Sequence, residues 1–162
     1  MTPSNSERPP KHELREPDEP QQPPLSVLLR NARRAVADHV RLALDEAGFA
    51  DLPPNGPFVL SALAFGQAPH SEVISRLGVS KQAAGQLVET LVGRGYLERF
   101  PDPADGRRFT LALTVRGERA GTVVRSAAAQ LEAAVEDIAG ADGLRTAKQV
   151  LEAVIEMGAM DE

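Results

Sequence analysis

Cysteine is absent from the 162-residue chain. Disulfide bonds, thiolate metal sites, cysteine nucleophiles and thiol-based redox sensing are therefore excluded. Tryptophan is absent as well, there is a single tyrosine, and aromatic residues make up 4% of a chain that is 42% hydrophobic. A core must then be assembled from Ala, Val, Leu and Ile, which suits helices packed on helices better than a β-sandwich.

The sequence also lacks the motifs of an enzyme. It contains no glycine-rich phosphate loop, no nucleophile paired with a base and no metal-binding motif. The three histidines, His12, His39 and His70, lie far apart without ligand spacing, so a surface or core role is favoured over a metal site for each. We therefore expect a protein that is not an enzyme and that binds neither a metal nor a cofactor.

No stretch approaches the roughly 20 apolar residues that cross a membrane, and the N-terminus has no apolar signal-peptide core. The sequence thus predicts a cytoplasmic protein without a membrane partner. Residues 1–24 are rich in Pro, Glu and Gln and cannot bury enough apolar surface to fold, so a disordered Pro-rich tail is predicted there. A plain solvated extension is favoured over a partner-binding segment. Residues 25–162 form the predicted domain.

Amphipathic helices are predicted at both ends of this domain. Apolar residues recur at three- and four-residue steps through residues 25–48, with Gly48 as the stop. A second long pattern runs over residues 115–158, with Thr114 as N-cap and a break at residues 140–143. The expected inward positions include Leu25, Leu28, Leu29, Ala32, Val36, Val40, Ala43 and Ala47 in the first region, and Val115, Arg119 through its stem, Val123, Ala127, Leu131, Ala134, Val135, Ile138, Leu144, Ala147, Val150, Leu151, Val154, Ile155 and Met157 in the second.

A helix-turn-helix is predicted in the middle of the domain. A loop over residues 51–57 and a short apolar helix over 58–65 precede it. Residues 71–77 then form a short helix, a Gly-containing turn follows, and Ser80 caps a second helix that runs from Lys81 to about Gly93. Two short helices joined in this way make a helix-turn-helix. The inward face of the second helix is expected to carry Ala83, Leu87, Val88 and Leu91.

A β-hairpin is predicted next. Gly95 ends the second helix, and residues 96–100 can form a strand. A cluster of turn residues occupies 101–106, and residues 109–114 then alternate between apolar and less apolar side chains. A hairpin after a helix-turn-helix is a wing. The fold class predicted is mainly α with a small β wing, a winged helix-turn-helix unit over about 57–115.

The formal net charge of -5 argues against a nucleic-acid partner until its distribution is considered. Between His70 and Gly121, eight Lys and Arg residues oppose six Asp and Glu residues, a balance of +2, so the remainder of the chain carries -7. A mildly basic winged unit thus sits on an acidic body, and this asymmetry directs one face towards phosphates.

Three stretches resemble MarR-family regulators. V-S-K-Q-A-A-G-Q-L-V, residues 79–88, resembles the family's recognition helix, and L-V-G-R-G-Y, residues 91–96, its continuation. The strongest match is D-P-A-D-G-R-R-F-T-L-A-L-T-V-R-G, residues 102–117, where the family's wing pattern is filled by Asp105, Arg107, Leu113, Thr114 and Gly117. The resemblance covers roughly residues 25–157. Gly56-Pro57 departs from it, because the family usually has Gln there.

The resemblance implies a function as well as a fold. It implies dimerisation helices at about 25–48 and 115–158, and a homodimer that binds double-stranded DNA at a palindromic operator as a ligand-responsive repressor. It further implies a small lipophilic or phenolic effector held between the dimer helices and the winged unit. His39 and Arg41 are candidates to contact this effector, although an ordinary surface or core role is favoured for both.

Candidate DNA contacts come from the second helix and the wing. A recognition helix presents its N-terminal residues to base edges, and Gln can pair bidentately with adenine. Ala84 and Gly85 are expected to let that helix approach the groove closely. Arg107 is expected to enter the minor groove, oriented by Asp105. The predicted DNA-binding residues are Ser80, Lys81, Gln82, Gln86, Arg94, Asp105, Arg107 and Arg108, with Arg94 and Arg108 as phosphate contacts. The alternative is a winged-helix module that dimerises and binds proteins without binding DNA.

Overall fold

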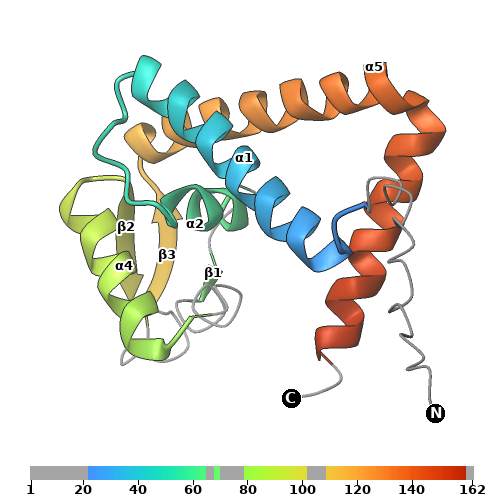
Figure 1. Cartoon of the computed structure of the whole chain (residues 1–162). Coiled ribbons are helices and arrows are strands. Elements are labelled where there is room, and N and C mark those ends of the chain that lie inside the picture. The colour runs from blue at the N-terminus through green and yellow to red at the C-terminus, as the bar shows by residue number, and fades with distance from the viewer. Residues whose placement is uncertain (1–21, 65–67, 70–78, 102–108, 160–162) are drawn as a thin grey trace, which may run out of the picture.

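The computed structural model describes residues 22–64, 68–69, 79–101 and 109–159. Figure 1 shows two long helices, α1 and α5, beside a lobe made of a small sheet and α4. The predicted fold class, mainly α with a small β wing, is confirmed. The elements are α1 (Leu25–Glu46), α2 (Gly56–Ala62), β1 (Ala68–Pro69), α4 (Lys81–Gly93), β2 (Leu97–Pro101), β3 (Phe109–Leu113) and α5 (Val115–Ala159).

The ends of α1 and α5 follow local backbone chemistry. Gly48 adopts a positive φ of 83°, and Phe49 N donates to Leu44 O at 2.8 Å, so α1 stops where the sequence predicts. Thr114 caps α5, because its Oγ1 accepts a hydrogen bond from Gly117 N at 3.1 Å. Both predictions are confirmed.

A sharp bend divides α5 at Gly140, whose φ of 72° and ψ of 166° are not helical. The predicted break at residues 140–143 therefore occurs at its first residue. Figure 1 shows the helix turning there into a second arm, which we call the C-terminal arm (residues 141–159). Lys148 Nζ lies 2.7 Å from Glu132 Oε2, an ion pair that joins the two sides of the bend.

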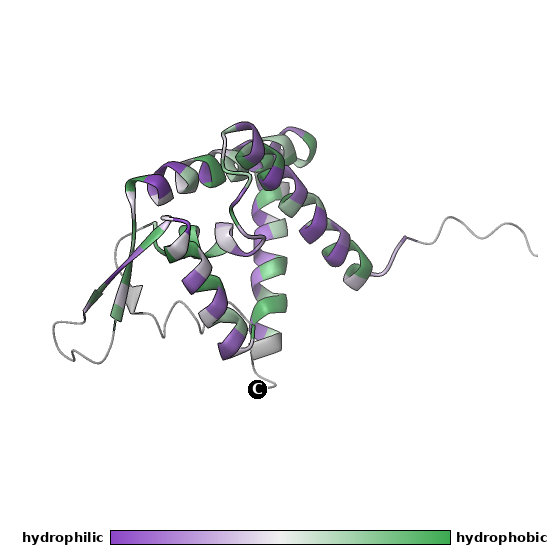
Figure 2. Cartoon of the chain, turned by 90° about the vertical axis from the view of Figure 1, so that its left-hand side faces the viewer, coloured by the Kyte–Doolittle hydropathy of each residue, from purple (hydrophilic) through white to green (hydrophobic). Residues whose placement is uncertain are grey.

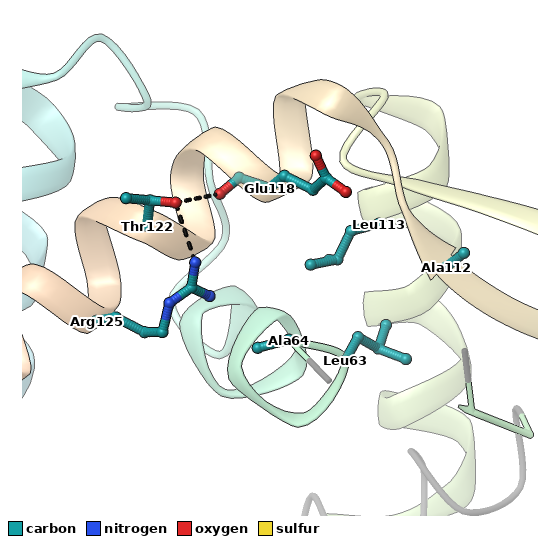
Figure 3. A pocket seen from close by; sticks show the side chains of 7 residues that line it. All are labelled: Leu63, Ala64, Ala112, Leu113, Glu118, Thr122 and Arg125. Atoms are coloured by element: carbon teal, nitrogen blue, oxygen red, sulfur yellow. Dashed lines mark hydrogen bonds between the residues drawn. The ribbon is translucent and has the colours of Figure 1, made fainter. Parts of the chain in front are cut away.

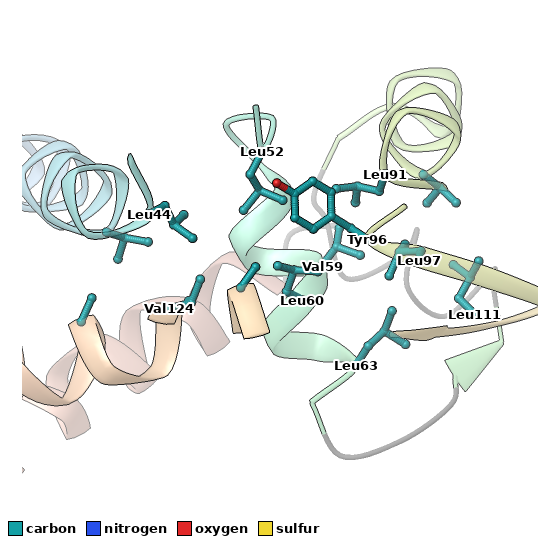
Figure 4. Packing of buried hydrophobic residues seen from close by; sticks show 14 residues of the cluster. Leu44, Leu52, Val59, Leu60, Leu63, Leu91, Tyr96, Leu97, Leu111 and Val124 are labelled. Carbon is teal, nitrogen blue, oxygen red and sulfur yellow. The ribbon is translucent and has the colours of Figure 1, made fainter. Parts of the chain in front are cut away.

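The core surrounds α2 (Figure 4). Val59, Leu60 and Leu63 are buried there. Their neighbours come from several elements: Leu44 of α1, Leu52 of the loop before α2, Leu91 of α4, Tyr96 and Leu97 around the start of β2, Leu111 of β3, and Ala120, Val124 and Ala127 of α5. Burying one such side chain stabilises the fold by about 1.5–3 kcal/mol. The core therefore fixes α2 and α4 against the long helices.

The predicted loop over residues 51–57 is two residues too long, because α2 begins at Gly56. Pro57 lies in the first turn of α2, where the missing N–H of proline costs no helical hydrogen bond. Phe58, expected to be the first apolar residue of this helix, is 49% exposed.

The hairpin of the wing is confirmed, and it belongs to a larger sheet than predicted. β2 and β3 pair antiparallel with Leu97 opposite Leu113 and Phe100 opposite Thr110. A further strand, β1, pairs with the other edge of β3, giving the order β1-β3-β2. β1 has two residues, too few to produce a period in the sequence. The predicted helix over 71–77 lies outside the described residues, and so do residues 102–106 of the turn predicted at 101–106.

Much of the apolar surface predicted to face inward is exposed in the single chain. On α1, Val40 is buried as expected, whereas Leu25, Leu28 and Val36 are exposed. On α5, Ile138 is 87% exposed, and the C-terminal arm exposes Val150, Leu151, Val154, Ile155 and Met157. Figure 2 shows hydrophobic and hydrophilic residues alternating along the ribbons of these helices. No helix among the described residues has an apolar stretch that would reach across a bilayer.

Candidate nucleic-acid interface

The N-terminal end of α4 presents a polar surface. Ser80 caps the helix as predicted, since its Oγ accepts a hydrogen bond from Ala83 N at 3.3 Å. Lys81, Gln82 and Gln86 are all exposed. Gln82 and Gln86 are four residues apart, so they lie above one another on one face of the helix.

The charge at this end of α4 favours an anion. The first N–H groups of a helix carry partial positive charge and point along the axis, away from the helix. The first turn of α4 contains Lys81 and no acidic residue. A phosphate placed there would meet both the helix terminus and an ammonium group.

The buried face of α4 corrects two predictions. Ala84 is fully buried with Val88 and Leu91, so it cannot face a groove as expected. Ala83, expected inside, is exposed. Ala84 lies one helical turn before Val88, and the two therefore share the inward face. The small exposed residue between the polar side chains is Ala83.

Arg94 lies at the opposite end of α4 from Lys81. The helix between them has 13 residues, so the two ends are about 20 Å apart at 1.5 Å per residue. Arg94 Nη1 donates a hydrogen bond to the carbonyl oxygen of Asp51. These contacts favour a structural role for Arg94 and do not test its predicted contact with phosphate.

The predicted wing contacts, Asp105, Arg107 and Arg108, lie outside the described residues. The hairpin that carries them is described on both sides. Pro101 and Phe109 form its last described register pair.

A group of polar side chains that the sequence did not predict lies at the C-terminal end of α4. We call Asp51, Arg94, Tyr96 and Arg116 the Asp51 cluster. Asp51 Oδ1 accepts hydrogen bonds from Tyr96 Oη at 2.6 Å and from Arg116 Nη2 at 2.8 Å. Arg116 Nη1 also donates to Arg94 O at 2.5 Å, and its guanidinium carbon lies 4.3 Å from the centre of the Tyr96 ring.

These contacts shift two pKa values in opposite directions. The hydrogen bond from Tyr96 and the positive charge of Arg116 hold the pKa of Asp51 below its usual value. Burial, together with the hydrogen bond to Asp51, raises the pKa of Tyr96 to about 12. At neutral pH the tyrosine is therefore a hydrogen-bond donor and the aspartate an anionic acceptor.

The two effector candidates on α1 make structural contacts. His39 Nε2 lies 3.2 Å from Ala127 O of α5, which makes it the donor in a link between the long helices. Arg41 donates to Ala50 O and Leu52 O, both at 2.7 Å, and pairs with Asp45. These contacts agree with the ordinary structural role favoured from the sequence.

A cavity of about 350 Å³ lies between the end of α2, β3 and α5. Figure 3 shows Glu118, Thr122 and Arg125 of α5 at this cavity, opposite Leu63 and Leu113. Thr122 Oγ1 accepts a hydrogen bond from Arg125 Nη2 at 3.0 Å. The full lining is Leu63, Ala64, Ala112, Leu113, Glu118, Thr122 and Arg125. The candidates predicted from the sequence are not part of this lining.

A family model described as the MarR family matches residues 50–108. The winged part of the chain is therefore similar to the MarR family. Solved MarR-family structures share the fold well beyond this segment. The reduced form of MarR from E. coli has a TM-score of 0.67 at 23% identity, over 83% of this chain and 98% of that one. No curated protein sequence matches the chain.

Two further structures of this fold contain a small molecule. NadR in complex with 4-hydroxyphenylacetate has a TM-score of 0.66 at 20% identity, over 86% of this chain and 97% of that one. PcaV from Streptomyces coelicolor, in complex with its natural ligand, has a TM-score of 0.64 at 24% identity, over 82% of this chain and 92% of that one. The resemblance to MarR regulators predicted from the sequence is confirmed.

Within this MarR fold, the Asp51 cluster should make the free energy of unfolding depend on pH in the acidic range. The pKa of Asp51 is lowered in the folded state, so its stabilising contribution is complete above its usual pKa of 3.8 and is lost as pH falls through the folded value. Asp51→Asn is therefore expected to be less stable than wild type at pH 7, with the difference shrinking in more acidic solution. Urea unfolding of both proteins from pH 7 to pH 3 measures this. A difference that grew towards low pH would contradict the assignment.

Proposed function

We propose that the chain is a sequence-specific DNA-binding transcriptional regulator that acts in the cytoplasm. The observation that carries this proposal is the N-terminal end of α4, where a capped helix with exposed Lys81, Gln82 and Gln86 stands beside a wing. A helix presented in this way fits the major groove, and Lys81 is placed to meet phosphate while the glutamines reach base edges. The MarR-type fold supports the same role.

We propose further that the regulator is a homodimer on a palindromic operator. The exposed apolar side chains of α1 and the C-terminal arm support this, because a face of that size needs a cover in water. A two-fold pair covers the same face of both copies and brings two α4 helices to one side of the molecule. Two half-sites one turn of DNA apart would then be read together.

A ligand-responsive repressor is the form we propose for this regulator. The cavity beside α5 is at the lower limit of the volumes that hold small ligands. Its apolar wall of Leu63 and Leu113 suits a lipophilic or phenolic body, and Arg125 offers a donor to an acidic group. The 4-hydroxyphenylacetate named for NadR supports a phenolic effector. His39 and Arg41 are engaged in the contacts described above.

The alternative is a winged-helix module that dimerises and binds proteins. A mobility shift with a promoter fragment at low and at high salt separates the two. The regulator is expected to bind and to lose affinity steeply with salt, as counterions return to the phosphates. No shift at low salt would reject DNA binding and favour the alternative.

Replacing Gln82 or Gln86 by alanine is expected to relax sequence preference. A bidentate contact with a base edge contributes about 1–3 kcal/mol of discrimination, which corresponds to roughly 5- to 150-fold in relative affinity. Competition between selected operator DNA and random DNA measures this ratio for each variant.

Gln130→Ala is the matched control, because Gln130 is an exposed glutamine on α5, away from α4. It should leave both affinities unchanged. If the Gln82 and Gln86 variants weakened binding equally on operator and random DNA, the glutamines would be backbone contacts and not base contacts.

A further inference from the structure

We propose that the Asp51 cluster holds α4 at a fixed angle to the long helices and thereby determines which spacing of DNA half-sites the protein accepts. Asp51 and Arg116 are positioning residues in this proposal and do not contact DNA. The proposal rests on the proposed function, since it concerns two recognition helices of one dimer.

Three separate segments meet at one carboxylate oxygen. Asp51 belongs to the loop between α1 and α2, Tyr96 follows the end of α4, and Arg116 lies in the first turn of α5. Asp51 Oδ1 accepts from both Tyr96 and Arg116, at 2.6 and 2.8 Å. Arg116 also donates to Arg94 O, which is the carbonyl of the C-cap of α4. The orientation of α4 is therefore tied to α5 through charge-assisted hydrogen bonds.

The loop that carries Asp51 is itself held by α1. Arg41 donates to Ala50 O and to Leu52 O, the carbonyls on either side of Asp51, both at 2.7 Å. Arg94 donates to the carbonyl of Asp51 itself. A continuous series of contacts therefore runs from α1 through residues 50–52 to the end of α4.

Packing leaves this junction little freedom to tilt. The Tyr96 ring is fully buried, and the Arg116 guanidinium covers it at 4.3 Å. Thr114 Oγ1 donates to Gly95 O at 2.5 Å, which joins the strand–helix connection to the turn after α4. Side chains in such a junction are held on several sides, so removing one acceptor loosens the others.

The cluster lies where small rotations have large effects. It is at the C-terminal end of α4, and the polar residues that face the groove are at the other end, about 20 Å away at 1.5 Å per residue. A tilt of about 10° at the cluster moves the far end by about 3.5 Å, close to the rise of one base pair. In a two-fold dimer both α4 helices would move. A dimer whose Asp51 clusters are loose would therefore bind half-sites at several spacings.

The test uses DNA selected from a random duplex library by the wild-type protein. The selected half-sites are then placed in three duplexes, at the selected centre-to-centre spacing and at one base pair more or less. Wild type is expected to favour the selected spacing. Asp51→Ala is expected to reduce that preference by about tenfold, the equivalent of one charged hydrogen bond, while binding a single half-site as wild type does.

Two controls separate positioning from plain stability. Asp142→Ala removes an exposed ion pair with Arg145, of the same chemistry but within the C-terminal arm, and should leave the spacing preference intact. Tyr96→Phe keeps the ring under Arg116 and removes one donor to Asp51, so an intermediate preference is expected even if Asp51→Ala does not fold. Circular dichroism at the binding temperature checks that each protein is folded.

The outcomes are distinguishable. If wild type selects no sequence from the library, the proposed function fails, and this inference fails with it. If wild type selects a site and folded Asp51→Ala or Tyr96→Phe shows the wild-type spacing ratio, the proposed function stands and the positioning role is rejected. A loss of affinity equal at all three spacings likewise makes the cluster a stabilising contact only.

Discussion

Gly117→Ala is expected to lose about 3 kcal/mol or more of folding stability. Gly117 lies in the first turn of α5 directly against the backbone of Tyr96. A Cβ at this position would overlap the Tyr96 carbonyl oxygen and lie 3.1 Å from its carbonyl carbon. Backbone cannot rotate aside as a side chain can, so the loss falls at the upper end of the range for overpacked sites.

The Tyr96 carbonyl has no room to retreat. Its oxygen accepts hydrogen bonds from Thr114 N at 3.1 Å and Thr114 Oγ1 at 3.3 Å. Moving it would break the connection between β3 and α5. A loss of this size lowers the melting temperature by about 6–12 °C in a domain of this length.

Gly93→Ala is the matched control in this experiment. Gly93 is also helical, but a Cβ there meets nothing within 4 Å. The change should stabilise the protein by about 0.5–1 kcal/mol, because alanine loses less backbone entropy than glycine in a helix. The two substitutions are therefore expected to change folding stability in opposite directions. Equal melting temperatures for both variants would show that the contact at Gly117 does not constrain the fold.

Ile155→Glu is expected to convert the proposed dimer into a folded monomer. Ile155 is 71% exposed in the single chain, so glutamate is tolerated there without a partner. In the proposed dimer the same position is covered, and a two-fold interface contains the substitution twice. Burying two unpaired carboxylates costs several kcal/mol, so dimerisation should weaken about a thousandfold.

Gln149→Glu provides the comparison on the same arm. Residues 149 and 155 lie about 120° apart around the helix, and Gln149 is exposed without belonging to the apolar face. It adds the same charge and should leave the dimer intact. Light scattering across micromolar concentrations reports the mass of both variants, and helical circular dichroism reports their fold. A dimeric Ile155→Glu protein would remove the C-terminal arm from the proposed interface.

Features governed by neighbouring residues were predicted well from the sequence. Gly48 and Gly95 both adopt a positive φ where the helices were expected to end. Ser80 and Thr114 both cap the helices that follow them. Each of these depends on one backbone conformation or one short hydrogen bond, so the local residue type is sufficient.

Features that depend on distant residues were not predictable in this way. Asp51 bonds to Tyr96 and Arg116, which are 45 and 65 positions away in the sequence. No spacing rule joins residues across such distances. The wrong assignment of Ala83 as buried and Ala84 as exposed has a different cause. Two adjacent alanines are equally apolar, so the sequence does not indicate which of them faces inward. The exposed apolar face of the C-terminal arm shows that periodicity predicts a face to be covered without naming what covers it.

The sheet order β1-β3-β2 has a consequence for how the protein behaves at high concentration. Both outer strands end in proline, Pro69 in β1 and Pro101 in β2. Proline has no N–H to offer to a further strand, and Glu98 and Arg99 place charges along the β2 edge. An exposed edge strand can form backbone hydrogen bonds with the edge strand of another molecule, and this pairing starts aggregation. The proline-ended, charged edges of this sheet therefore resist pairing with the sheet of a second copy.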